Sequence, residues 1–131
     1  MVNIIDTKEE VFLIKRAKSI VNASRGVWVF LKTTPNAWFQ ISAYLIAIGL
    51  GVFFQVTRTE WLFLIMAGGL VIIAECLNTA IEIDIDLTSP VYHPYAKDTK
   101  DVAAGAVLLT AILAAVICLY IFVPYLASYL G

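Results

Sequence analysis

Polar side chains that could do chemistry recur within one apolar stretch of this sequence. Glu75, Asn78 and Glu82 are separated by three and four residues, and Asp86 follows four residues later. On an α-helix this spacing places the four side chains roughly along one face. A carboxylate in the interior of a bilayer costs about 2.5 to 3.5 kcal/mol on insertion scales. A face of this kind is therefore a candidate functional site.

Two carboxylates with an amide between them could divide the work of phosphoryl transfer. Glu75 would take a proton from a hydroxyl, and Glu82 would hold a divalent cation on a phosphate. This chemistry depends mainly on positioning and charge neutralisation, and the sequence has no GxxxxGK[ST], GxGxxG, HRD or DFG motif. The alternative for Glu75 is a structural role, either protonated or paired with a basic residue of a neighbouring helix. Glu82, Asp84 and Asp86 could equally form a solvated helix end.

Composition predicts that the elements carrying these residues lie in a membrane. Of the 131 residues, 61% are hydrophobic and 15% are charged, which is outside the usual range of soluble domains. The formal net charge of -1 does not indicate nucleic-acid binding. The two cysteines lie in apolar segments without metal-ligand spacing and are predicted to be small core residues. The first residues lack the pattern of a cleavable signal peptide.

Residues 7–34 are predicted to form an amphipathic helix on the membrane surface. They hold six of the nine Lys and Arg residues, interleaved with apolar side chains at helical spacing. The apolar stripe would enter the headgroup region while the basic side chains face anionic lipid. Pro35 would then help to turn the chain into the membrane. A plain anchoring helix without a part in chemistry is the alternative.

Three apolar segments follow that are long enough to cross a bilayer. Residues 37–56 contain no charged side chain, and about twenty residues at 1.5 Å each match a hydrocarbon core of about 30 Å. The other two predicted crossings are residues 61–83 and 102–123, with a polar loop over 84–101 and the last crossing ending near Pro124. The predicted fold is an all-α membrane protein with one membrane domain over residues 1–131.

The distribution of Lys and Arg predicts the orientation of the chain. Six lie on the N-terminal helix, two in the 84–101 segment, one between the first two crossings and none after the third. The positive-inside rule then places the N-terminus and the 84–101 loop in the cytoplasm and the C-terminus outside. Small residues in the third crossing allow close helix packing. Three helices alone would not readily shield the carboxylates from lipid, so we expect several protomers to assemble around the site.

The 84–101 loop contains residues that could bind a nucleotide. His93 follows Tyr92, and Lys100-Asp101 stand just before the third crossing, where the N-terminus of a helix favours phosphate. A single histidine in a loop is more commonly a surface residue, and a Lys-Asp pair is more commonly a solvated ion pair of little consequence. Their predicted position on the same side of the membrane as the carboxylates favours a joint role.

Taken together, these motifs resemble the bacterial integral-membrane diacylglycerol kinase and undecaprenol kinase family. The resemblance rests on the E-x-x-N-[ST]-A-I-E-x-x-x-D core of residues 75–86, on Tyr92-His93, and on a Lys-Asp pair before an alanine-rich third crossing. The surface helix and the three crossings also follow in the same order. The resemblance therefore covers nearly the whole chain.

The resemblance implies a homotrimer in the bacterial cytoplasmic membrane that phosphorylates a lipid hydroxyl with MgATP. The lipid alcohol would arrive from the bilayer and the nucleotide from the cytoplasm. Glu75 matches the family's general base, which meets the lipid substrate, and Glu82 matches a residue that binds the metal and ATP. The other matching positions are the supporting polar residues Asn78 and Asp86 and the ATP-binding residues Lys15, Tyr92, His93, Lys100 and Asp101.

The end of the surface helix departs from the family pattern. Family members usually carry a metal-binding glutamate there, followed by an arginine and then by an acidic residue or histidine. Counting back without gaps places Thr34, Trp38 and Gln40 at these positions. One expected metal carboxylate is thus absent. The change would weaken metal binding, require a substitute such as a water held by Thr34, or alter or abolish the activity.

The sequence is compatible with two functions from different classes. In the first, a lipid kinase, Glu75 deprotonates a primary hydroxyl while Mg²⁺ on Glu82 and the ammonium of Lys100 neutralise the γ-phosphate of ATP. In the second, the chain is a catalytically silent family member that serves membrane assembly or lipid binding. An ion or proton pathway is disfavoured because the first and third crossings offer no acidic or basic partners. The sequence does not choose between diacylglycerol, undecaprenol and another lipid alcohol, because selectivity for the tail is spread over apolar side chains.

Overall fold

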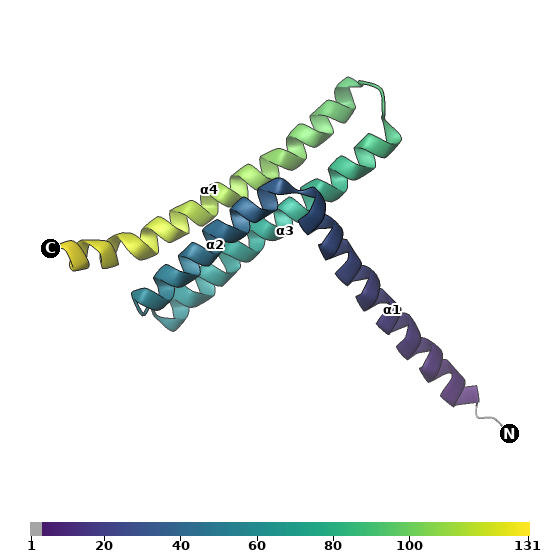
Figure 1. Ribbon diagram of the computed structural model, residues 1–131, viewed down its shortest axis with the longest axis horizontal. Helices are drawn as coiled ribbons and strands as arrows, with labels where there is room; N and C mark the ends of the chain where they lie inside the picture. Colours follow the sequence, from purple (N-terminus) through teal and green to yellow (C-terminus); the bar gives the residue numbers. More distant parts are fainter. Residues whose placement is uncertain (1–3) are drawn as a thin grey trace. The chain divides into compact units, whose positions relative to one another are not determined.

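The computed structural model describes the backbone of residues 4–131 and the side chains of residues 11–131, and every element in this part of the chain is a helix (Figure 1). The helices are α1 (Ile4–Thr33), α2 (Pro35–Phe53), α3 (Arg58–Thr88) and α4 (Pro94–Leu130). They belong to two compact units, of which one contains α1 and the other spans Thr34–Gly131. The predicted all-α fold class is confirmed.

The bounds of α1 lie close to the predicted surface helix of residues 7–34. Large apolar side chains on this helix, such as Phe12, Val21 and Trp28, are exposed. The guanidinium of Arg16 lies 5.1 Å from the ring centroid of Phe12, as in a cation–π contact. Exposed apolar and basic side chains on one helix suit the interface of a membrane, so the location at a membrane surface remains a prediction that this helix supports.

The helices α2, α3 and α4 are long and apolar enough to cross a membrane. Many of their large apolar side chains are exposed in this chain, among them Leu45, Phe63 and Leu109. Exposed apolar side chains along a whole helix are costly in water and ordinary in lipid or against further protein. The three apolar segments identified in the sequence are therefore confirmed as helices of spanning length and composition.

The helices extend beyond the segments predicted to cross the membrane. The prediction of a loop over residues 84–101 is wrong, because residues 84–88 continue α3 and residues 94–101 begin α4, which leaves only residues 89–93 as the connection. Charged side chains end an apolar run without ending a helix, since exposed Asp and Lys are tolerated on a helix surface. Pro124 does not end α4 either, because the helix continues to Leu130.

The ends of the α3–α4 connection are fixed by local interactions. Pro94 occupies the first turn of α4, where its missing N–H is not needed. The Nδ1 atom of His93 accepts a hydrogen bond from the backbone N–H of Tyr95 at 3.3 Å and so caps the helix. His93 and its neighbours are thereby held at the start of α4.

The opposite end of α3 is closed by a capping box. The backbone N–H of Glu60 donates to Thr57 Oγ1 at 3.4 Å, and Glu60 Oε2 accepts from the backbone N–H of Thr57 at 2.7 Å. The hydroxyl of Tyr125 on α4 donates to the same Glu60 oxygen at 2.9 Å. Beside this cap lies a core that contains Leu64 and Phe122. These contacts tie α3 to α4 at the end farthest along α3 from Glu75.

Gly68 of α3 lies directly against the ring of Tyr44 on α2. A Cβ atom added there would lie 2.1 Å from the ring of Tyr44 on α2, whereas a Cβ added at Gly69 would meet nothing within 4 Å. Membrane helices use small residues in this way to bring their backbones together. Gly68 therefore leaves room for the ring of Tyr44 between α2 and α3.

Gly68→Ala is expected to destabilise the protein by about 1 to 3 kcal/mol, because the added methyl group overpacks the α2–α3 contact. Gly69→Ala is the matched control, since it adds the same group to the same turn in open space. Thermal unfolding of the two purified variants in one detergent checks the prediction. Equal melting temperatures would contradict it.

Candidate active site

The polar face predicted on α3 is present and its deepest members are buried. Glu75 is 3% exposed and Asn78 is 8% exposed, and both belong to the buried side of α3. Asn78 Nδ2 donates a hydrogen bond to Glu82 Oε1 at 3.1 Å. The structure thus joins Asn78 to Glu82 along the helix, as their i, i+4 spacing indicates.

The helix α2 contributes a direct partner for Glu75. Gln40 Nε2 donates a hydrogen bond to Glu75 Oε2 at 3.0 Å. A carboxylate that is shielded from water needs such donors, because an unpaired buried charge is unfavourable. From the sequence, Gln40 was only a position that departs from the family pattern, and its contact with Glu75 was not predicted. The contact depends on how α2 and α3 pack against each other.

A second link between α2 and α3 consists of two threonines. Thr79 Oγ1 donates to the backbone carbonyl of Glu75 at 2.9 Å, and it lies 2.8 Å from Thr34 Oγ1. Since the single proton of Thr79 is used in the first bond, Thr34 donates in the second. Thr34 is 9% exposed. The hydroxyl of Thr34 therefore stabilises, through Thr79, the turn of α3 that contains Glu75. Thr79 was not singled out in the sequence, although it fills the [ST] position of the core motif.

Three of the six residues predicted to bind ATP lie at the α3–α4 connection, namely Tyr92, His93 and Lys100. A hollow of about 360 Å³ is lined by Asp86, Tyr92, His93 and Lys100, among others. The ammonium of Lys100 forms an ion pair with Asp86. Asp101 instead pairs with Lys97, at 3.5 Å one helical turn away, and does not line this hollow. Lys15 lies on α1, in the other unit, so its position near the phosphates remains a prediction.

Oxygen atoms that suit a hard cation lie at Asn78 and Glu82. Asn78 Oδ1 is buried without a hydrogen-bond partner among the described residues, and the same side chain contacts Glu82. Within the described residues no cluster of three or more His, Cys, Asp or Glu side chains could hold a metal ion. Mg²⁺ commonly uses one or two protein oxygens together with substrate phosphates and water. The donor set therefore fits a magnesium ion carried by a nucleotide.

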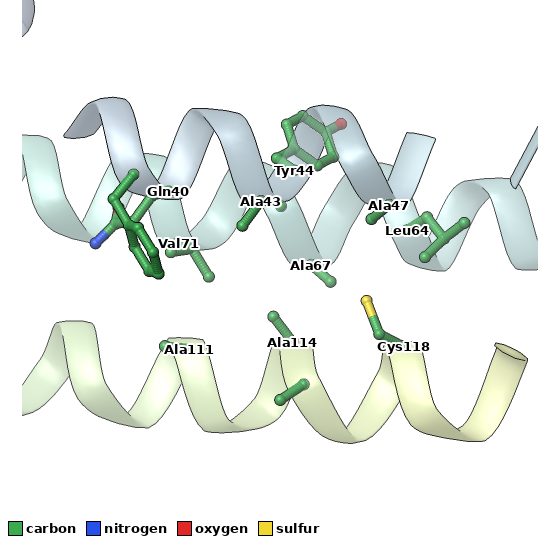
Figure 2. Close-up of a pocket in the computed structure, with 13 residues that line it drawn as sticks. Gln40, Ala43, Tyr44, Ala47, Leu64, Ala67, Val71, Ala111, Ala114 and Cys118 are labelled. Atoms are coloured by element: carbon green, nitrogen blue, oxygen red, sulfur yellow. The ribbon is translucent and has the colours of Figure 1, made fainter. Parts of the chain in front are cut away.

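An apolar cavity of about 230 Å³ opens between α2, α3 and α4. Figure 2 shows small side chains of α2 and α3 facing those of α4, with Gln40 at one end of the row and Cys118 at the other. Glu75 does not line this cavity, but Gln40 both lines it and bonds to Glu75. Gln40 is therefore the link between an apolar cavity and a buried carboxylate.

The sequence of this chain is similar to those of known proteins. Residues 21–122 match the family described as prokaryotic diacylglycerol kinase. An undecaprenol kinase of Bacillus subtilis (strain 168) is 38% identical over 109 residues, which cover 83% of this chain and 89% of that protein. A diacylglycerol kinase of Escherichia coli (strain K12) is 30% identical over 104 residues, which cover 74% of this chain and 83% of that protein. The resemblance inferred from the motifs is confirmed, and the chain belongs to the prokaryotic diacylglycerol kinase family.

Proposed function

We propose that this chain is a lipid kinase that transfers the γ-phosphate of ATP to a membrane lipid alcohol such as diacylglycerol or undecaprenol. The observation that carries the proposal is the buried Glu75, which is paired with Gln40 on helices long enough to cross a membrane. Membership of a family whose relatives are named as kinases of two lipid alcohols supports it. The site chemistry of the following paragraphs belongs to the same proposal.

Glu75 acts as the general base. It takes the proton of the lipid hydroxyl while the hydroxyl oxygen attacks the γ-phosphorus and the bond to the β-phosphate oxygen breaks, so that the products are a phospholipid, ADP and a proton. The hydrogen bond from Gln40 occupies Glu75 Oε2 and leaves the other carboxylate oxygen for the substrate. A positioned base of this kind contributes about 10² to 10⁴ in rate.

The nucleotide binds at the α3–α4 connection. Tyr92, His93 and Lys100 line the same hollow, and the positive end of the α4 helix dipole favours phosphate there. Phosphate oxygens would take the place of Asp86 beside the ammonium of Lys100. Lys15 and Asp101 match ATP-binding positions of the family and complete the proposed set of ATP-binding residues.

Magnesium would be held by Glu82 and by the unpaired oxygen of Asn78. When bound, it supplies neutralisation of the charge on the transferred phosphate. The hydroxyl of Thr34 donates its proton to Thr79 and carries no charge, so it does not supply the negative charge of the carboxylate that the family pattern places there. Fewer carboxylates around the cation would raise the magnesium concentration that the reaction needs.

The active enzyme is a homotrimer in the bacterial cytoplasmic membrane, with the N-terminus and the α3–α4 connection in the cytoplasm and the C-terminus outside. Glu82 is only partly buried in one chain, and large apolar side chains of α4 such as Val116 and Leu119 are exposed. In a trimer, neighbouring protomers would cover Glu82 and these apolar side chains of α4. The excess of basic residues on the N-terminal side of α2 supports the orientation.

Purified protein in lipid bicelles with radiolabelled ATP and a series of lipid alcohols tests the proposal. We expect label in the lipid phase that depends on both the alcohol and magnesium. The second candidate is a catalytically silent family member that binds lipid, and the bond between Thr34 and Thr79 in place of a metal carboxylate favours it. Lipid binding without transfer to any alcohol, at magnesium concentrations up to tens of millimolar, would select this candidate.

A further inference from the structure

An ion pair bridges the hollow at the α3–α4 connection. The ammonium of Lys100 on α4 contacts Asp86 Oδ1 near the end of α3, and both residues line the hollow. The side chain of Asp86 is 68% exposed and that of Lys100 is 35% exposed. An ion pair with this exposure adds little to stability, because water screens it. A stronger partner for either residue can therefore replace it.

The phosphates of a nucleotide compete with Asp86 for the ammonium of Lys100. ATP carries more negative charge than one carboxylate, so its attraction to an ammonium at the same distance is larger. The hollow also lies at the start of α4, where the positive end of the helix dipole favours phosphate. ATP bound in the hollow therefore displaces Asp86 and leaves this carboxylate without its cation.

The displaced carboxylate lies at an unfavourable position. Asp86 belongs to the last turn of α3, which ends at Thr88, and this turn contains no basic residue. A negative charge at the C-terminal end of a helix is repelled by the helix dipole. A second cation within reach of Asp86 would remove this repulsion, so the structure around Asp86 favours the binding of one.

The candidate magnesium site lies one helical turn away on the same face of α3. Glu82 precedes Asp86 by four residues, which places their Cβ atoms about 5 to 6 Å apart. Two side chains at this spacing can hold one metal ion, as the two histidines of an H-E-x-x-H helix do. Asn78 is 8% exposed and donates to Glu82, and its Oδ1 is buried without a partner among the described residues. This unpaired oxygen marks a place where a cation can bind.

We propose that Asp86 changes partners when ATP binds, from Lys100 to the magnesium ion that Glu82 holds. The phosphates take the ammonium of Lys100, and Asp86 contributes a carboxylate oxygen to the cation that the nucleotide carries. Asp86 is then a metal-binding residue in the nucleotide complex alone. It supplies part of the negative charge that Thr34 does not provide. This inference rests on the proposed function, because it requires ATP in the hollow.

The test is the affinity of purified Asp86→Asn for a non-hydrolysable ATP analogue, adenylyl imidodiphosphate, measured by calorimetry with magnesium and with EDTA. Asparagine has the size of aspartate without the charge, so affinity for the magnesium-bound analogue should fall about tenfold, a scale typical of groups around a metal site. Affinity for the metal-free analogue should stay the same or rise, because no carboxylate competes for Lys100. Equal losses under both conditions, or no loss with magnesium, would overturn the inference.

Two further variants separate metal binding from other roles of Asp86. Asp84→Asn removes the same charge from the same helix, but Asp84 lies two residues from Glu82 and therefore on another side of α3. It should leave both affinities unchanged. Asp86→Glu keeps a carboxylate and should retain most of the affinity for the magnesium-bound analogue. A loss in Asp84→Asn as large as that in Asp86→Asn would mean that net charge alone is responsible, and the inference would be wrong.

These binding measurements distinguish the inference from the proposed function. A loss confined to the magnesium-bound analogue in Asp86→Asn supports the change of partners even if no lipid is phosphorylated. In an active enzyme, the magnesium concentration for half-maximal transfer should also rise about tenfold in this variant. Phosphate transfer by the wild type, together with equal losses of both affinities in Asp86→Asn, would overturn the inference and leave the kinase assignment intact.

Discussion

Glu75→Gln is expected to lower the rate of phosphate transfer to lipid by about 10² to 10⁴-fold, the range that a positioned general base contributes. The amide of glutamine does not take up the proton of the lipid hydroxyl. Its carbonyl oxygen can still accept the hydrogen bond from Gln40 Nε2, which in the wild type ends on Glu75 Oε2. The substitution therefore removes the base with little change in shape or in the α2–α3 contact.

Transfer of label from ATP to lipid by purified Glu75→Gln, together with size-exclusion chromatography and thermal unfolding, checks this result. Glu60→Gln is the matched control, because Glu60 is a carboxylate of the same helix that serves the capping box and Tyr125 at its other end. We expect the control to lose stability and to retain transfer. A Glu75→Gln enzyme with undiminished transfer would refute the role of Glu75 as base and with it the proposed mechanism.

The parts of the site that lie along one helix could be predicted from the sequence. The spacing of Glu75, Asn78 and Glu82 fixes their shared face on any α-helix, and the structure has two of them buried and two of them bonded to each other. The length and apolar character of the crossings likewise follow from local composition. These properties depend on helix geometry alone.

The contacts between helices could not be predicted in this way. The bonds from Gln40 to Glu75 and from Thr34 to Thr79 depend on the rotation of α2 about its axis and on its distance from α3, which Gly68 and Tyr44 help to set. The ends of α3 and α4 were also missed. A membrane boundary is a change of solvent, and the backbone hydrogen bonds of a helix continue across it.

Thr34→Glu is expected to change the magnesium dependence of the enzyme. Thr34 bonds to Thr79, and Thr79 precedes Glu82 by three residues on the same helix, so a longer acidic side chain at position 34 would reach toward Glu82. A second carboxylate would strengthen magnesium binding. We expect transfer at limiting magnesium to rise on the order of 10- to 100-fold, which is the scale on which groups around a metal site affect affinity.

The same substitution should be unfavourable when no metal is bound. It removes the Thr34–Thr79 bond and buries a carboxylate, so with EDTA we expect a loss of about 1 to 3 kcal/mol in stability, which magnesium should reverse. Thr34→Gln is the matched control, since it has the same size without the charge and should show neither the gain in transfer nor the response of its melting temperature to magnesium. If Thr34→Glu and Thr34→Gln behaved alike in both measurements, position 34 would have no part in the metal site, and the reduced metal ligation proposed for this chain would be wrong.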